Sequence, residues 1–266
     1  MTARQQDRLL RFAALIKREL DASGETVALI ARSGLDLRRF GLRYSHAGVS
    51  LKASANAPWS VRQLYYACDE QRPRLYDQGL SGFLFGTDDP AAGYVSIVLP
   101  NGSEAASLEG AALDTPRALR LLAQAYSANA YPFSLRYQNC NQWVAELLAA
   151  AWGDLGDPED LRSRAQGWLA GQGYRPQAVD VGQLMIAAPF VPMIHLDDHP
   201  PEDLDALRMR TSLPAAIEAF VRERAPGARR IEMCHDGPKA VIRHGWTPIE
   251  QGCRPQAGDR VVDLDE

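Results

Sequence analysis

Several segments of the chain repeat apolar residues every three or four positions, which is the spacing of an amphipathic helix. Near the N-terminus, before a stop signal at Gly24, this stripe consists of Leu9, Phe12, Ala13, Ile16 and Leu20. The same spacing predicts helices over residues 115–125, 140–151, 160–171 and 213–224. Helices are therefore expected along the whole chain.

Other segments are continuously apolar, or alternate between apolar and polar residues, and turn residues bound them as they bound β-strands. These segments are 26–31, 43–51, 59–66, 94–99, 184–191, 230–234 and 240–243. Only a short turn, residues 54–58, separates the second segment from the third, so we expect an antiparallel hairpin. Strands that come before most of the helices favour an α+β fold with an antiparallel sheet over a doubly wound fold.

Residues 197–203 form the clearest linker, because they include two prolines and four acidic residues. We therefore expect two parts. Residues 1–196 form a core that includes the N-terminal helix, and residues 197–266 form a C-terminal α/β extension packed on that core.

The composition is that of an ordinary soluble globular protein and argues against two classes of partner. The 266 residues carry a net charge of −4, with 46% hydrophobic and 23% charged residues. No basic block with interleaved aromatic residues stands out, so we expect no nucleic-acid partner. No apolar run approaches the roughly 20 residues that span a bilayer, so the sequence predicts no transmembrane segment.

The N-terminal segment lacks the apolar core of a secretory signal peptide, which predicts a cytoplasmic protein for the sequence as it stands. A leader upstream of it would instead direct the protein to the periplasm or envelope. The four cysteines are spread singly, with no C-x-x-C pair. A disulfide among Cys68, Cys234 and Cys253 stays open.

Cys140 is the candidate nucleophile, because it stands at the predicted first turn of the helix at 140–151. Asn139 can cap that helix through its side-chain oxygen. The positive end of the helix dipole favours a thiolate, which is the nucleophilic form of cysteine. A free cysteine is often only a small buried hydrophobe, but polar amides flank this one on both sides.

His46 is the candidate base, on the predicted strand at 43–51. Its small neighbours Ala47 and Gly48 leave room for the end of a helix to approach. The neighbouring strand alternates so that Gln63 shares a face with Val61 and Tyr65. We expect the Gln63 amide oxygen to accept a hydrogen bond from the imidazole and hold its tautomer, although an exposed strand glutamine is an equal alternative.

The residues around Cys140 suggest an oxyanion site and a cleft. The backbone N–H of Cys140 is the first expected donor, and nearby side chains supply others. Trp143 is expected to line a cleft beside the thiol, whereas the other tryptophans are expected to pack in the core. The predicted cleft residues are Gln138, Asn139, Asn141 and Trp143.

We expect neither a metal nor a cofactor. His195 and His199 have the spacing of two helical metal ligands, but Pro200 follows them directly and opposes a helix. The residues Cys234, His235, His244 and Cys253 match the spacing of no ordinary zinc module.

These stretches resemble known families. His46 in Ser-His-Ala-Gly-Val and Cys140 in Asn-Cys-Asn-Gln-Trp resemble the permuted papain-like, NlpC-type superfamily, which includes lecithin retinol acyltransferase-like proteins. More closely, the chain resembles the bacterial domain of unknown function DUF 2145, over residues 43–49, 58–65, 75–79 and 132–148. Relatives tend to carry histidine where this chain has Gln63, and glutamine cannot shuttle a proton.

The resemblance implies a circularly permuted papain-like fold, in which an antiparallel sheet packs against the cysteine-bearing helix. It also implies a thiol hydrolase or acyltransferase in which His46 deprotonates Cys140, and the thiolate attacks an amide or ester bond. The expected substrate is a small molecule, peptide or lipid. The alternative is a papain-like binding module of the bacterial envelope that is catalytically weak or inactive, an interpretation that Gln63 favours.

Overall fold

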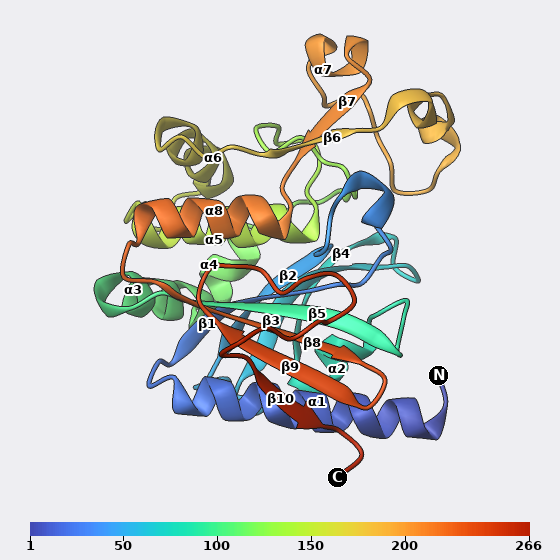
Figure 1. The fold of residues 1–266 in the computed structure, drawn as a ribbon. Helices are drawn as coiled ribbons and strands as arrows, with labels where there is room; N and C mark the ends of the chain where they lie inside the picture. The colour runs from blue at the N-terminus through green and yellow to red at the C-terminus, as the bar shows by residue number, and fades with distance from the viewer.

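Eight strands form one antiparallel sheet within the part of the chain that the structure describes (Figure 1). The structure is a computed structural model that describes residues 1–266, except for the side chains of Ile186 and Pro189. In the order in which they neighbour one another, the strands are β10 (Arg260–Asp263), β9 (Lys239–His244), β8 (Arg229–Asp236), β5 (Ala92–Leu99), β1 (Val27–Arg32), β2 (His46–Leu51), β3 (Ser60–Ala67) and β4 (Arg72–Gln78).

Helices cover both faces of this sheet (Figure 1). One face lies against α1 (Ala3–Ala22) and α2 (Leu80–Phe85). The other face lies against α3 (Gly102–Leu113), α5 (Cys140–Trp152) and α8 (Pro214–Arg224), with α4 (Thr115–Arg120) beside α3 and α6 (Leu161–Gly171) beside α5. The α+β class with a large antiparallel sheet is therefore confirmed.

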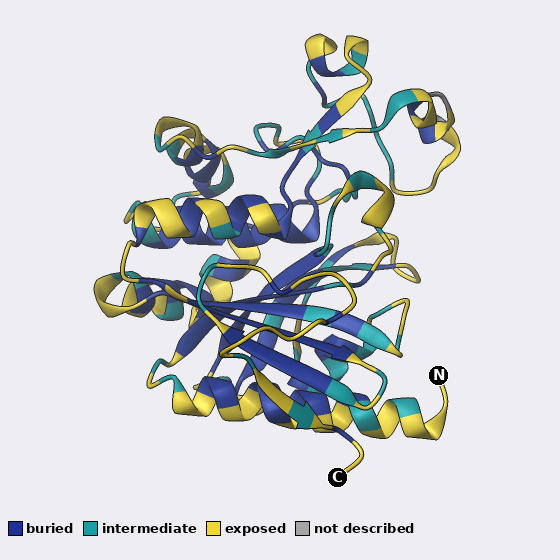
Figure 2. Ribbon diagram, in the orientation of Figure 1, coloured by how far each residue is buried: buried dark blue, intermediate teal, exposed yellow. Residues whose placement is uncertain are grey.

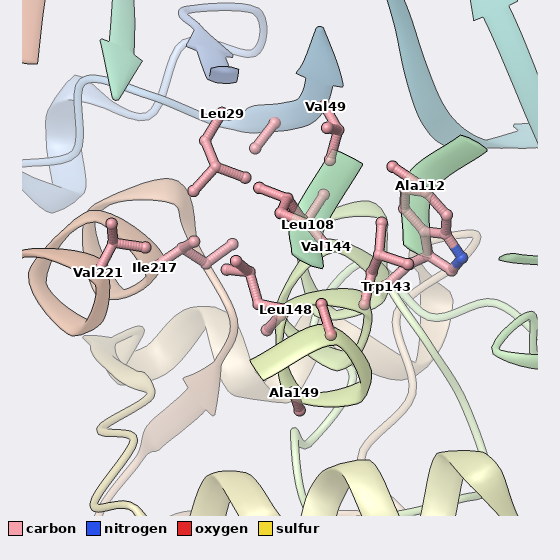
Figure 3. Packing of buried hydrophobic residues seen from close by; sticks show 14 of the residues in the cluster. Leu29, Val49, Leu108, Ala112, Trp143, Val144, Leu148, Ala149, Ile217 and Val221 are labelled. Carbon is pink, nitrogen blue, oxygen red and sulfur yellow. The ribbon is translucent and has the colours of Figure 1, made fainter. Parts of the chain in front are cut away.

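The central strands are apolar because both of their faces are covered. Every residue of β1 and β2 is buried, and strand alternation sends their side chains to opposite sides. Val49 packs on the α5 side with Leu29 and Val144, as Figure 3 shows, whereas Ile30 packs on the α1 side. The predicted hairpin is also confirmed, because Val49 of β2 pairs with Arg62 of β3.

The N-terminal helix forms as its apolar stripe predicts. Figure 2 shows α1 buried along the side that faces the sheet and exposed along the other. Its first turn is closed by a capping box, in which the Thr2 hydroxyl accepts from the Gln5 backbone and the Gln5 side chain accepts from the Thr2 backbone.

The C-terminal residues complete the main sheet, which corrects the expectation of an extension beside the core. Strand β8 pairs along its whole length with β5, and β9 and β10 continue the sheet from there. The physical reason is that β5 is buried in the middle of the molecule, where an unpaired strand edge would leave backbone groups without hydrogen bonds.

Two further segments differ from the sequence-based expectation. Residues 184–190 of the segment predicted as a strand, 184–191, lie in a 3-10 helix, η2 (Gly182–Phe190). The predicted linker lies between β6 (Gln177–Asp180) and β7 (Arg208–Thr211), the two strands of a small second sheet, and its last residues begin α7 (Pro201–Asp205). This small sheet projects at the top of Figure 1, away from the main sheet.

Gly48 of β2 lies close against residues of β3. A Cβ at this position would meet the Val61 Cγ1 atom at 2.5 Å and the Arg62 backbone oxygen at 2.9 Å. We predict that Gly48→Ala lowers the free energy of unfolding by about 1–3 kcal/mol in urea titrations, because packed side chains and backbone must shift.

Gly110→Ala in α3 is the matched control, since nothing lies within 4 Å of an added Cβ there. Alanine favours a helix interior, so the control should leave stability unchanged or raise it by up to about 1 kcal/mol. Equal effects of the two substitutions would contradict the close approach at Gly48.

Candidate functional site

Cys140 is the first residue of α5, and the segment before it fixes the start of that helix. The Asn139 side chain accepts from the Gln142 backbone N–H at 2.7 Å, so the predicted cap is confirmed. The other end of the same amide donates to the Thr211 hydroxyl at 2.8 Å and to the Ser212 carbonyl at 3.2 Å. The position of Cys140 is therefore tied to the end of β7.

A fully buried carboxylate holds the first two turns of α5. Glu146 accepts from the amide nitrogens of Gln138, Gln142 and Gln166, and it forms an ion pair with Arg162 at 2.9 Å. A buried charge is tolerated only when it is paired and hydrogen-bonded, and this one is both. The polar residues around Cys140 that the sequence made conspicuous therefore serve largely to anchor the helix.

His46 begins β2, and its ring is held by the side chain that the sequence singled out. The His46 Nε2 atom lies 2.7 Å from the Gln63 Oε1 atom, and both residues are buried. The Gln63 Nε2 atom donates to the Gln78 Oε1 atom at 2.6 Å, which orients the amide so that its oxygen faces the ring. His46 therefore carries its proton on Nε2 and keeps Nδ1 as a lone-pair nitrogen.

The structure brings the segments that carry Cys140 and His46 into contact through a hydrogen bond from a side chain to the backbone. The Asn141 side chain donates to the Ser45 carbonyl at 3.1 Å, so the residues next to Cys140 and His46 are in contact. The side chains, however, start on different faces of the sheet. Cys140 belongs to the core beneath α5, whereas the His46 ring lies 5.9 Å from the Phe83 ring of α2.

No hydrogen bond joins the Cys140 sulfur to the His46 ring among the residues that the structure describes. The ring instead packs 4.7 Å from the ring of Tyr65. The Cys140–His46 pair therefore stays a prediction about the reacting protein.

Burial governs the protonation of both groups. Desolvation raises the pKa of the Cys140 thiol to about 11, although the first backbone N–H groups of α5, Arg32 and the Tyr126 hydroxyl act in the opposite direction. Desolvation, and then the charge of Arg32, lower the pKa of His46 to about 3. The start of α5 therefore lowers the pKa of the thiol in the expected direction, but desolvation outweighs it and the thiol stays protonated at pH 7.

Arg32 is the neighbour that sequence reasoning missed. It is 3% exposed, donates to the Tyr65 hydroxyl at 2.6 Å and lies over the Phe83 ring. It has no carboxylate partner among the described residues, and its Nε atom makes no hydrogen bond there. A buried arginine without a counter-ion is uncommon, and a basic residue at the end of an apolar strand is the sequence signal that could have identified it.

Most of the predicted cleft residues serve the core instead. Gln138 is fully buried and uses both ends of its amide, toward the Ala123 backbone N–H and the Leu121 carbonyl. Trp143 is also fully buried, and its indole donates to the Ala118 carbonyl, so the structure places it in the core and not at a cleft (Figure 3). Asn141 has a buried Oδ1 atom without a hydrogen-bond partner among the described side chains.

The structure also places the cysteine and histidine groups that were not expected to bind metal. Cys234 and Cys253 form a disulfide, which settles the pairing that the sequence left open. His199 is buried against the Asn129 backbone. Among the described residues, no group of three or more His, Cys, Asp or Glu side chains is arranged to hold a metal ion. No described helix is both long enough and apolar enough to cross a bilayer.

The chain matches a known protein family. A family model described as "Uncharacterized protein conserved in bacteria (DUF2145)" matches residues 19–221, about three quarters of the chain. The match includes β1 to β7 and α2 to α7, and it ends before β8. No curated protein and no solved structure matches the chain.

Because the His46 imidazole is buried in its neutral form, we predict that the free energy of unfolding falls in acid. Histidine has a pKa near 6.5 in the unfolded chain, whereas folded His46 has a pKa of about 3. At pH values between the two, the unfolded chain binds a proton at this residue and the folded protein does not. Lowering the pH from 7 to 5 should therefore cost about 2 kcal/mol through this residue. In urea titrations, His46→Gln should reduce the loss between pH 7 and pH 5 by about that amount.

Gly110→Ala is the control, because it removes no titratable group and nothing lies within 4 Å of the added Cβ. It should lose as much stability between the two pH values as the unmodified protein does. A His46→Gln variant with that same loss would show that the His46 ring is not buried in its neutral form.

Proposed function

The chain belongs to the bacterial family DUF2145, and from this premise we propose that it is a papain-like thiol hydrolase or acyltransferase. Cys140 is the nucleophile, His46 is the general base, and an amide or ester carbonyl is the target. The observation that carries the proposal is the 2.7 Å contact between the His46 Nε2 atom and the Gln63 Oε1 atom. A catalytic histidine needs one nitrogen held in this way and the other free to accept a proton.

The pKa values determine the order of events. The pKa of Cys140 is raised to about 11 and that of His46 is lowered to about 3, so full proton transfer from the thiol to the imidazole is strongly unfavourable at rest. The resting pair is therefore neutral. The Nδ1 atom of His46 takes the thiol proton as the sulfur attacks the carbonyl, which is general-base catalysis and needs no stored thiolate.

The first turn of α5 and Arg32 supply the positive potential. The backbone N–H groups of Cys140 and Asn141 already lower the pKa of the thiol, and they stand at the open end of the helix. These donors can stabilise the oxyanion that forms during attack. Arg32 lowers the pKa of the thiol as well, so its unpaired charge favours negative charge at the sulfur.

The chemical steps balance without a cofactor. The sulfur bonds to the carbonyl carbon, and the proton held by His46 passes to the leaving amine or alcohol as the C–N or C–O bond breaks. Water or another acceptor then attacks the thioester, loses its proton to His46 and releases the acyl group, which restores the thiol.

A second candidate is a papain-like binding module of the envelope that does not turn over substrate. The observation that favours it is the burial of Cys140, which is 8% exposed and carries a raised pKa. The Cys234–Cys253 disulfide supports an envelope location for either candidate, because such bonds persist in oxidising compartments.

Reaction with an activated ester tests the nucleophile directly. Incubation with 4-nitrophenyl acetate should release nitrophenolate and leave an acetyl group on Cys140, detectable by mass spectrometry of the intact protein and its peptides. We predict that Cys140→Ala abolishes this adduct and the release of nitrophenolate above background.

Cys68→Ala is the matched control, because Cys68 is the exposed free cysteine and lies at the end of β3. This variant should keep the adduct. Acetylation of Cys68 alone, or unchanged ester cleavage by Cys140→Ala, would refute the assignment.

The pH dependence of alkylation tests whether Cys140 rests as a neutral thiol or as an activated thiolate. In a Cys68→Ala background, iodoacetamide should modify Cys140 at a rate that still rises above pH 9, since only the thiolate reacts. Arg32→Gln should slow the reaction at each pH, because it removes a charge that lowers the pKa of the thiol.

Arg39→Gln, at an exposed position in the connection between β1 and β2, should leave the rate unchanged. A midpoint below about pH 8 would show an activated thiolate and contradict the neutral resting pair.

A further inference from the structure

A cavity of about 450 Å³ opens where the connection between β1 and β2 meets the end of β8. Its walls come from residues 33–43, 87–94, 235–236 and 251–253. The volume lies in the range of small-molecule sites in proteins. Neither Cys140 nor His46 lines it, so it is separate from the site proposed above.

A buried imidazole, that of His235, is among the residues that line the cavity. His235 is 4% exposed, its ring lies 4.9 Å from the Phe12 ring, and it has one backbone hydrogen bond, at Ala91. Desolvation dominates and lowers the pKa of His235 to about 4, so the ring is neutral at pH 7. A neutral imidazole offers a lone pair to an N–H donor.

The imidazole fits only because its partner in the sheet is glycine. Gly93 of β5 pairs with His235 of β8, and a Cβ on Gly93 would lie 3.0 Å from the His235 Nε2 atom and 3.2 Å from the Ser33 Oγ atom. The ring therefore occupies the space that a side chain would fill. Cys253, which also lines the cavity, is fixed to β8 by its disulfide with Cys234.

Three aspartates at the opening of the cavity, its rim, carry negative charge without an ion-pair partner among the described residues. Asp88, Asp89 and Asp236 line the cavity, and none has an ion-pair partner in the described part of the chain. The two arginines of the lining are already paired, Arg38 with Asp36 and Arg43 with Glu232, both at 2.7 Å. The rim therefore attracts cations.

We propose that this cavity binds a small organic amine. Its ammonium group is held by the rim carboxylates and by the His235 lone pair, and its apolar body lies against Leu35, Leu37 and Leu42. An organic cation fits better than a metal ion, because among the described residues no three acidic, His or Cys side chains converge as metal ligands.

Titration with three matched probes tests the charge rule. In calorimetry on the full chain, phenethylamine should bind at least about tenfold more tightly than neutral 2-phenylethanol, and phenylacetate should not bind. Asp89→Asn and Asp236→Asn should each weaken phenethylamine about fivefold, because each removes one nearby charge. His235→Gln and Gly93→Ala should weaken it as well.

Two controls keep the outcome clear. Asp205→Asn, at an exposed position in α7, should leave the affinity unchanged, and so should Cys140→Ala, whose effect concerns only the proposed acyl transfer. The proposal is overturned if phenylacetate binds as tightly as phenethylamine or if millimolar phenethylamine does not bind. It also fails if the Asp89 and Asp236 variants bind phenethylamine with the affinity of the unmodified protein.

Discussion

The hydrogen bond between His46 and Gln63 is the interaction on which the account of the site depends. Adjacent antiparallel strands bring the two side chains to the same face of the sheet, and Gln78 on the next strand orients the amide. An imidazole in this setting has a fixed tautomer and one available nitrogen. Without the Gln63 oxygen, nothing described would determine which nitrogen carries the proton.

Desolvation is the second constraint, and it acts on both candidate groups. The helix N-terminus lowers the pKa of Cys140 as the sequence suggests. Desolvation of the buried thiolate raises that pKa by more than the first turn of α5 lowers it. The same burial keeps His46 neutral. Arg32 has opposite effects on the two ions of an activated pair, because its charge stabilises a thiolate and destabilises an imidazolium. Proton transfer is therefore tied to the moment of attack.

Much of the fold follows from local sequence patterns. The stripe of α1, the hairpin of β2 and β3, and the cysteine-led α5 were predictable because each periodicity lies within a single segment. Gln63 was identifiable for the same reason, since strand alternation places it beside His46. Its contact with the ring is present in the structure, while its part in catalysis stays a prediction.

The remainder depends on contacts between distant segments. The pairing of β5 with β8 joins residues separated by at least 130 positions, so the sequence suggested an extension where the sheet continues. Strand β4 contains Pro73 and three charged residues, a pattern that reads as a loop, and this concealed Gln78. Arg32, Gln138 and Trp143 were misjudged or missed because burial of a polar or aromatic side chain is decided by the elements that cover it.

The most direct test of the central claim is the ¹⁵N and ¹H spectrum of the His46 ring in the folded protein. We predict a neutral imidazole with its proton on Nε2, a state that is unchanged from pH 7 to pH 5 and altered by Gln63→Leu. A ring that titrates near its ordinary pKa of about 6.5, or that carries its proton on Nδ1, would contradict the account.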